Sequence, residues 1–146
     1  MATFTATKGK AGIQPRAVHA GTTTVVSTFI WGATNLDDTT TSATAAAGDV
    51  INMVKLPNGA TVTRVAYVGN RADGAYKLGT SASASLFDAT VSLSAGITEA
   101  TIGIPYTVST SDDAVVAYEW LNATVVSTGY TLSDQITVIV DYVIDN

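Results

Sequence analysis

The sequence predicts an all-β protein, an antiparallel, jelly-roll-like β-sandwich of about eight strands. Short runs rich in valine, isoleucine, threonine and aromatic residues recur along the chain, and glycine, asparagine, aspartate and serine interrupt them. The runs follow one another at intervals of roughly 8–12 residues, which is typical of sandwiches and barrels. No stretch has an amphipathic helical pattern of useful length, since Ala43–Ala47 is too short to form an independent helix.

Residues 1–21 are expected to form an extended N-terminal arm, and residues 22–146 the β-sandwich domain. The arm consists of short Thr/Ala and Gly/Lys pieces and Pro15, with little periodicity. The first predicted strand, Thr22–Trp31, is β-branched and aromatic. Because both of its faces are partly apolar, we expect it to be central in a sheet or covered by a partner. Its two apolar faces are Val25, Phe29 and Trp31 on one side and Val26 and Ile30 on the other.

The clearest turn signal is Pro57-Asn58-Gly59. Proline presets φ for a turn, and Asn-Gly tolerates the positive φ of a tight reversal. Apolar, β-branched runs flank this turn, which predicts a β-hairpin that pairs Asp49–Leu56 with Ala60–Gly69. The preceding low-complexity segment, Ala33–Gly48, is expected to be a surface loop.

Further strands are predicted downstream of the hairpin. Pro105 cannot donate to a strand ladder, so its strand should lie at an edge or carry a bulge. The last strand is the most apolar, and Ile136, Val138, Val140, Tyr142 and Ile144 share one of its faces. The predicted segments are Tyr76–Gly79, Leu86–Leu93, Ala100–Val108, Ala114–Leu121, a short run within Asn122–Tyr130, and Asp134–Ile144.

Charged residues are unusually few. They make up 13% of the chain, against about 25% in an ordinary soluble domain. Charge is depleted in the cores of protein interfaces, so this composition favours a surface that is covered by neighbouring subunits. The alternative is a monomer coated with polar uncharged side chains, which the 24 threonines could supply.

The charge is also unevenly distributed. Residues 1–36 carry no acidic side chain, whereas all 12 acids lie in the remainder of the chain. An acidic body argues against nucleic-acid binding, which needs clustered Lys and Arg. The arm could instead contact an acidic neighbour, such as another copy of this body, or it could be a frayed polar terminus. Its candidate partner-binding residues are Lys8, Lys10, Arg16 and His19.

No catalytic, cofactor or metal site is predicted. The chain has no cysteine, and its single histidine excludes a multi-histidine metal centre. The acidic pairs Asp37-Asp38 and Asp112-Asp113 fall in predicted turns, where aspartate side chains bond backbone amides. No Gly-x-Ser-x-Gly elbow or Gly-x-x-x-x-Gly-Lys phosphate loop occurs. With neither a signal-peptide pattern nor an apolar run of about 18 residues, we expect a soluble protein that is made in the cytoplasm and does not bind membranes.

Two weaker patterns concern sugars. Asn122-Ala123-Thr124 matches a glycosylation acceptor, but so short a pattern often arises by chance. Aromatic residues could line a sugar-binding platform, although aromatics that alternate along a strand more often belong to the core. The residues concerned are Trp31, Trp120, Tyr118, Tyr130 and Tyr142.

A pattern of turns and strands spans roughly residues 22–146. It consists of Gly48-Asp49-Val50-Ile51, the run from Val54 to Val62, Leu78-Gly79-Thr80-Ser81, the turn Ser94-Ala95-Gly96, and the apolar strand Gln135–Val143. This pattern resembles that of the decoration, cement or head-stabilising proteins of tailed bacteriophages.

This resemblance implies a non-enzymatic virion protein, without a cofactor, on the outer surface of the capsid. It would bind the major capsid protein and its own copies, with a homotrimer as the favoured oligomer. The alternative is a carbohydrate- or receptor-binding β-sandwich module of a phage fibre or tail. A small β-fold hydrolase would require a solvent-facing pair of acids with a raised pKa.

Overall fold

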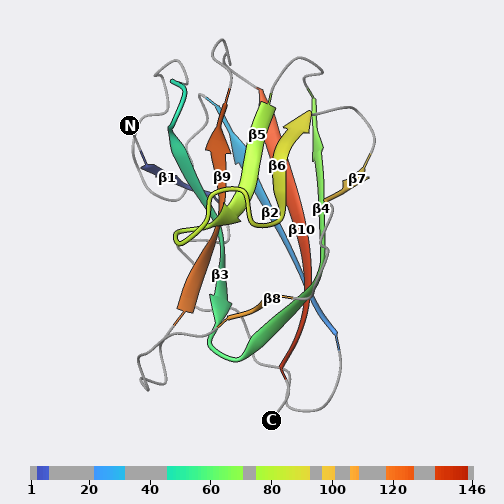
Figure 1. Cartoon of the computed structure of the whole chain (residues 1–146). Helices are drawn as coiled ribbons and strands as arrows, with labels where there is room; N and C mark the ends of the chain where they lie inside the picture. Colours follow the sequence, from blue (N-terminus) through green and yellow to red (C-terminus); the bar gives the residue numbers. More distant parts are fainter. Residues whose placement is uncertain are drawn as a thin grey trace.

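Two β-sheets packed face to face form the described part of the molecule (Figure 1). This confirms the predicted β-sandwich. The described residues include no helix, and therefore no helix that could cross a membrane. The computed structural model describes residues 3–6, 22–31, 46–70, 75–92, 97–100, 106–108, 118–126 and 134–144, with side chains of 89–92 excepted.

The first sheet has the strand order β1-β3-β9-β5-β6. Strand β1 runs parallel to β3, and every other neighbouring pair in this sheet is antiparallel. The strands are β1 (Thr3–Thr5), β3 (Val50–Pro57), β9 (Tyr118–Val125), β5 (Ala75–Thr80) and β6 (Asp88–Ser92).

The second sheet has the order β2-β10-β4, with two short strands on the outer edge of β4. Strand β7 pairs with Ala66 and Tyr67, and β8 pairs with Thr61 and Val62. All pairs in this sheet are antiparallel. The strands are β2 (Thr23–Ile30), β10 (Gln135–Ile144), β4 (Ala60–Gly69), β7 (Thr98–Glu99) and β8 (Tyr106–Thr107).

The strand order is that of a jelly roll. From β2 to β5 the chain changes sheet at every step, and it does so again from β6 through β7 and β8 to β9 and β10. Only β5 and β6 are consecutive long strands that pair with each other. The second strand and the last strand lie side by side, which closes the arrangement.

The predicted hairpin between β3 and β4 is wrong in its pairing, although its turn and strand limits are correct. The chain reverses at Asn58 and Gly59, and Gly59 has the expected positive φ of 83°. However, β3 pairs only with β1 and β9 among the described strands, whereas β4 pairs in the other sheet. The turn is stabilised by Val108, which accepts a hydrogen bond from Gly59 N (3.0 Å) and donates one to Ala60 O (2.8 Å).

The reason for this difference is burial. Each of the two strands has an apolar face, which includes Ile51 and Leu56 in β3 and Val62 and Val65 in β4. A hairpin would place these faces side by side in one sheet. Opposite sheets let them meet across the core, where all four side chains are inaccessible to solvent.

The core confirms the predicted alternation of the last strand. In β10 every second side chain faces the core, and the five predicted residues are between 0% and 7% exposed. Across the sandwich they meet inward side chains of the first sheet, including Ile51, Leu78 and Leu121. The alternation of outward and buried side chains therefore continues along the whole of β10, because this strand lies between β2 and β4.

A β-bulge in β4 changes which side chains face outward. Asp141 is opposite Arg64 and Tyr142 is opposite Val62, so Thr63 is the extra residue. Strict alternation from Val62 would turn Arg64 into the core. The bulge instead leaves Arg64 on the outer face, beside Asp141.

The N-terminal residues enter the sandwich rather than remaining apart from it. Strand β1 pairs with β3, and Phe4 is only 6% exposed. Its ring lies 5.6 Å from that of Phe29 and 5.2 Å from that of Trp31. Residues 3–6 therefore differ from the arm expected over residues 1–21; residues 7–21 lie outside the described part.

Two other strands differ from expectation. The predicted strand Ala114–Leu121 and the short run after it contribute to one strand, β9, and residues 114–117 lie outside the described part. Strand β2 is not central, since β10 is its only described neighbour and Val26 is 46% exposed; the other alternative, a partner that covers this strand, stays a prediction. The edge position expected for the Pro105 strand agrees with β8, although Pro105 itself is not among the described residues.

Candidate functional site

The predicted site residues lie outside the described part of the chain. This holds for the partner-binding candidates Lys8, Lys10, Arg16 and His19, and for the acidic pairs Asp37-Asp38 and Asp112-Asp113. Among the residues that the structure does describe, no group of three or more metal-ligating side chains occurs. The candidate site must therefore be sought on the outer faces of the two sheets.

The outer face of the first sheet carries a cluster of one cation and two aromatic rings, hereafter the Lys55 cluster (Lys55, Tyr118 and Trp120). In the β3–β9 register Lys55 is opposite Trp120, and Pro57 is opposite Tyr118. The two rings are perpendicular, with centroids 5.6 Å apart and an interplanar angle of 87°. Lys55 Nζ lies 4.8 Å from the Tyr118 centroid and 5.1 Å from the Trp120 centroid, which is within cation–π range.

Glu119 lies between Tyr118 and Trp120 in sequence, but its carboxylate is bonded to a residue outside the Lys55 cluster. Its neighbour across β3 is Leu56, a core residue, so Glu119 projects away from the Lys55 cluster. It accepts a 2.6 Å hydrogen bond from the hydroxyl of Tyr106 in β8, which connects the two sheets. Burial, and then this bond to a carboxylate, raise the pKa of Tyr106 to about 12.

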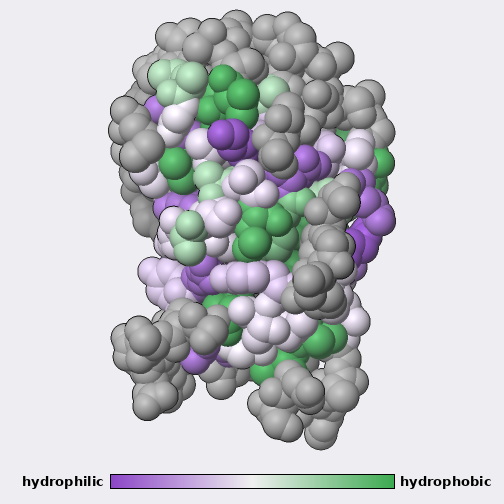
Figure 2. All heavy atoms as spheres, in the orientation of Figure 1, coloured by the Kyte–Doolittle hydropathy of each residue, from purple (hydrophilic) through white to green (hydrophobic). Residues whose placement is uncertain are grey.

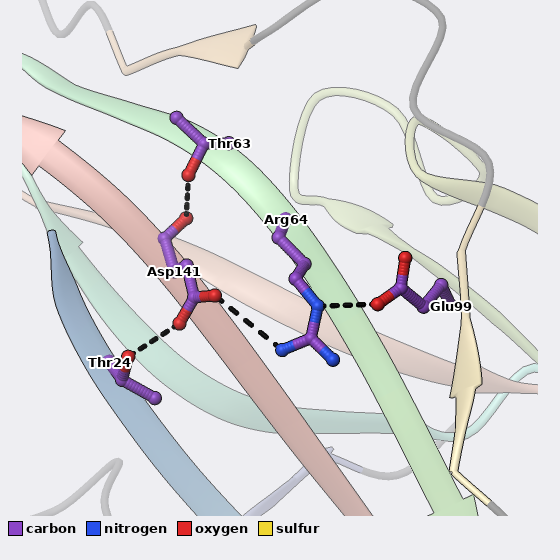
Figure 3. Close-up of polar contacts among 5 residues, drawn as sticks. All are labelled: Thr24, Thr63, Arg64, Glu99 and Asp141. Atoms are coloured by element: carbon purple, nitrogen blue, oxygen red, sulfur yellow. Dashed lines mark hydrogen bonds and ion pairs between the residues drawn. The ribbon is translucent and has the colours of Figure 1, made fainter.

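The outer face of the second sheet carries a polar network across four strands (Figure 3). Arg64 Nε donates to Glu99 Oε1 at 2.6 Å, and Arg64 Nη1 lies 3.5 Å from Asp141 Oδ2. Asp141 also accepts bonds from Thr24 at its carboxylate (2.6 Å) and from Thr63 at its backbone oxygen (3.2 Å). The hydrogen bond to Glu99 is the main cause that raises the pKa of Arg64.

Aliphatic and threonine side chains surround this network. Ile139 is opposite Val26 on one side and Ala66 on the other, which forms an apolar row across three strands. Threonine hydroxyls pair with one another at 2.9 Å between Thr28 and Thr137, and at 2.8 Å between Thr61 and Thr107. On the side drawn in Figure 2, small hydrophobic patches are interspersed with weakly polar and strongly hydrophilic residues.

Two of the five aromatic residues considered for sugar binding are in the core. Trp31 and Tyr142 are buried, and Tyr130 lies outside the described residues. Of the described candidates, only the two rings of the Lys55 cluster reach the surface, and Tyr118 is 39% exposed. Asn122 is 6% exposed in the middle of β9, so the glycosylation pattern there is a chance match, as expected.

Tyr118 and Trp120 are among the aromatic residues that the sequence offers for a sugar platform, but nothing in the sequence indicates either outer-face cluster as a whole. Lys55 and Trp120 become neighbours only through pairing of β3 with β9, which lie far apart in the chain. Arg64 and Asp141 become neighbours only through the β4–β10 register and its bulge. Alternation could have marked Lys55 as an outward residue, but it could not have named its partners.

Comparison with known proteins places the fold among phage capsid structures. No protein-family model matches the chain, and no curated protein matches it in sequence. Among solved structures, a chain in "Capsid of Ralstonia phage GP4" superposes with a TM-score of 0.72 and 14% identity, covering 99% of both chains. A chain in "Cyanophage Pam1 capsid asymmetric unit" gives a TM-score of 0.63 and 15% identity over 92% of both chains.

A third match is a chain in the acidic stable capsid structure of Helicobacter pylori bacteriophage KHP30. Its TM-score is 0.56 at 17% identity, over 86% of this chain and 89% of that one. At such low identities the likeness concerns the fold. This chain therefore shares its jelly-roll fold, over nearly its whole length, with chains found in phage capsids.

Proposed function

We propose that this protein is a non-enzymatic structural component of a phage virion, a decoration or cement protein that binds and stabilises the assembled capsid. The single observation that carries this proposal is the superposition on a chain of the Ralstonia phage GP4 capsid over 99% of both chains. A match of this extent includes both sheets.

The physical properties of the chain suit such a role. Cementing works by mass action, because a protein that binds the assembled lattice but not its separated subunits stabilises the lattice. The low proportion of charge, 13%, suits a surface that is covered by neighbours. A homotrimer would multiply weak individual contacts, and the basic residues Lys8, Lys10 and Arg16 would contribute further contacts from each copy.

Particles that lack the protein provide the test. Phage particles assembled without this chain would be incubated with the purified protein, and occupancy would be measured by gel densitometry and by cryo-electron microscopy. We expect saturable binding to the outer surface and a higher temperature of particle disruption. Failure to bind intact particles would reject the proposal.

The alternative of a glycan- or receptor-binding module has one observation in its favour, the partly exposed Tyr118 and Trp120. A glycan array probed with the wild-type protein distinguishes the two functions. Binding to a defined oligosaccharide in the absence of particle binding would favour a fibre or tail module.

A further inference from the structure

We propose that the Lys55 cluster is the site at which this protein docks onto the capsid, and that its partner there is a carboxylate-bearing segment of a capsid subunit. The inference rests on the proposed function, because it names the contact through which the protein would bind the capsid. Three features carry it: an ammonium group without a described carboxylate partner, two rings that hold it in place, and a lack of outward acids among the described residues of β3, β5 and β9.

The first feature is that Lys55 is not neutralised. No ion pair joins it to a described carboxylate, whereas Arg64 on the opposite face contacts both Glu99 and Asp141. The acid nearest to the cluster in sequence, Glu119, is bonded to Tyr106 instead. A cation–π contact attracts the ammonium without cancelling its charge, so Lys55 can still attract an anion.

The second feature is preorganisation. Lys55 Nζ lies within 5.1 Å of both ring centroids, and its stem is partly buried. A lysine held in one position loses less side-chain freedom on binding than a free one. The ammonium has three N–H donors, which leaves donors available to a carboxylate. Tyrosine and tryptophan are also the residues most enriched at the energetic centres of protein interfaces.

The third feature is the local charge. The protein as a whole is acidic, with a net charge of −5. Strands β3, β9 and β5 contain three charged residues: Lys55, Lys77 and the inward Glu119. Among the described residues of these three strands, no outward acidic side chain accompanies Lys55. An acidic partner would be repelled by most of the protein and attracted here.

Other ligands fit the cluster less well. A nucleic acid needs several clustered cations, and here a single ammonium lies between the rings. A sugar stacks on a flat ring face, whereas these rings are perpendicular and Lys55 lies over both. A single carboxylate matches both the charge and the size of the site.

The test compares charge reversal at two lysines. Lys55→Glu should weaken binding to phage particles assembled without this protein by about tenfold or more, since it replaces attraction by repulsion. Lys77→Glu is the matched control: it makes the same charge change at an exposed residue of the same sheet, outside the cluster. It should change binding by less than about threefold, a surface-charge effect below about 0.65 kcal/mol. Lys55→Arg should retain most binding, because arginine keeps the charge and the ring contacts.

Circular dichroism and thermal unfolding would verify that each variant folds. If Lys55→Glu does not fold, Lys55→Met takes its place in the binding measurement, because methionine keeps an aliphatic side chain at this position and removes the charge. Its binding should be weaker than that of the wild type and less sensitive to salt.

Equal binding by the wild type and Lys55→Glu, or equal losses in the two reversals, would overturn the inference while leaving the proposed function intact. Glycan binding that Trp120→Ala abolishes would also overturn it. A wild-type protein that ignores particles altogether would reject the proposed function and this inference together.

Discussion

Trp31 and Tyr76 join the two sheets through a hydrogen bond inside the core. The indole Nε1 of Trp31, at the end of β2, donates to the Tyr76 hydroxyl of β5 at 3.0 Å. Both side chains are at most 1% exposed. Since β2 and β5 belong to different sheets, this bond fixes how the sheets lie relative to each other in addition to the apolar contacts around it.

Removal of the Tyr76 hydroxyl should therefore destabilise the protein. Tyr76→Phe leaves the buried indole N–H without its acceptor, which should lower the free energy of unfolding by about 1–3 kcal/mol. The measurement is urea denaturation followed by tryptophan fluorescence. Tyr118→Phe is the control, since that hydroxyl is at the surface, and its change should stay within about 0.5 kcal/mol. Equal effects of the two substitutions would contradict this role for the bond.

Truncation of one isoleucine in the core should cost far more than truncation of another at the surface. Ile136 is fully buried in β10, and Ile97 is 62% exposed. Ile136→Ala should lower the free energy of unfolding by about 2–5 kcal/mol through lost burial and the cavity left behind. Ile97→Ala makes the same chemical change and should cost less than about 0.5 kcal/mol. Similar losses at both positions would mean that β10 is not the centre of the core.

Gly79 should not tolerate a side chain. A Cβ at this position would lie 2.0 Å from the backbone oxygen of Ser83 and 2.5 Å from the backbone carbon of Ala84, so the loop after β5 would have to move. Gly79→Ala should cost about 1–3 kcal/mol or more. It should also speed cleavage by chymotrypsin after Leu86, which ends this loop.

Gly48→Ala is the control for that experiment. Gly48 has a φ of 94° and open space around it, so its substitution strains the backbone without displacing a loop. It should lower stability without faster cleavage after Leu86. Resistance of Gly79→Ala to chymotrypsin at the wild-type level would show that the loop does not rest on this glycine.

The Tyr106–Glu119 bond predicts a pH dependence at alkaline pH. The pKa of Tyr106 is raised from 10.0 to about 12 in the folded protein. The stability that Tyr106 contributes to the folded protein is therefore fully present below pH 10, where the unfolded tyrosine keeps its proton. This stability is lost as the pH rises toward about 12. Thermal unfolding at a series of pH values should show a shallower alkaline decline in Tyr106→Phe than in the wild type.

Other tyrosines set the background for this measurement. Burial also raises the pKa of Tyr67 and Tyr142, so the wild-type decline is not due to Tyr106 alone. The difference in alkaline decline between the wild type and Tyr106→Phe gives the part of the decline that is due to Tyr106. Identical alkaline profiles would show that burial and the bond to Glu119 do not raise the pKa of Tyr106 in the folded protein.

The all-β class and most strand limits could be predicted from the sequence, because period-two burial is a local property of a strand. Strand β10 shows this most clearly, since its five predicted inward residues are all in the core. The turn at Asn58 and Gly59 could also be predicted, because positive φ depends on the residue itself. The partner-binding role of Lys8, Lys10, Arg16 and His19, by contrast, stays a prediction, because these residues lie outside the described part of the chain.

Strand pairing was decided by the tertiary structure. Nothing local distinguishes a hairpin from two strands that face each other across a core, and β3 and β4 adopt the second arrangement because it buries both apolar faces. The same non-local pairing brings Lys55 to Trp120, and one bulge at Thr63 brings Arg64 to Asp141. Alternation in a sequence indicates which side chains of a regular strand face outward, but bulges and the pairing of distant strands decide the final facing and the neighbours of each.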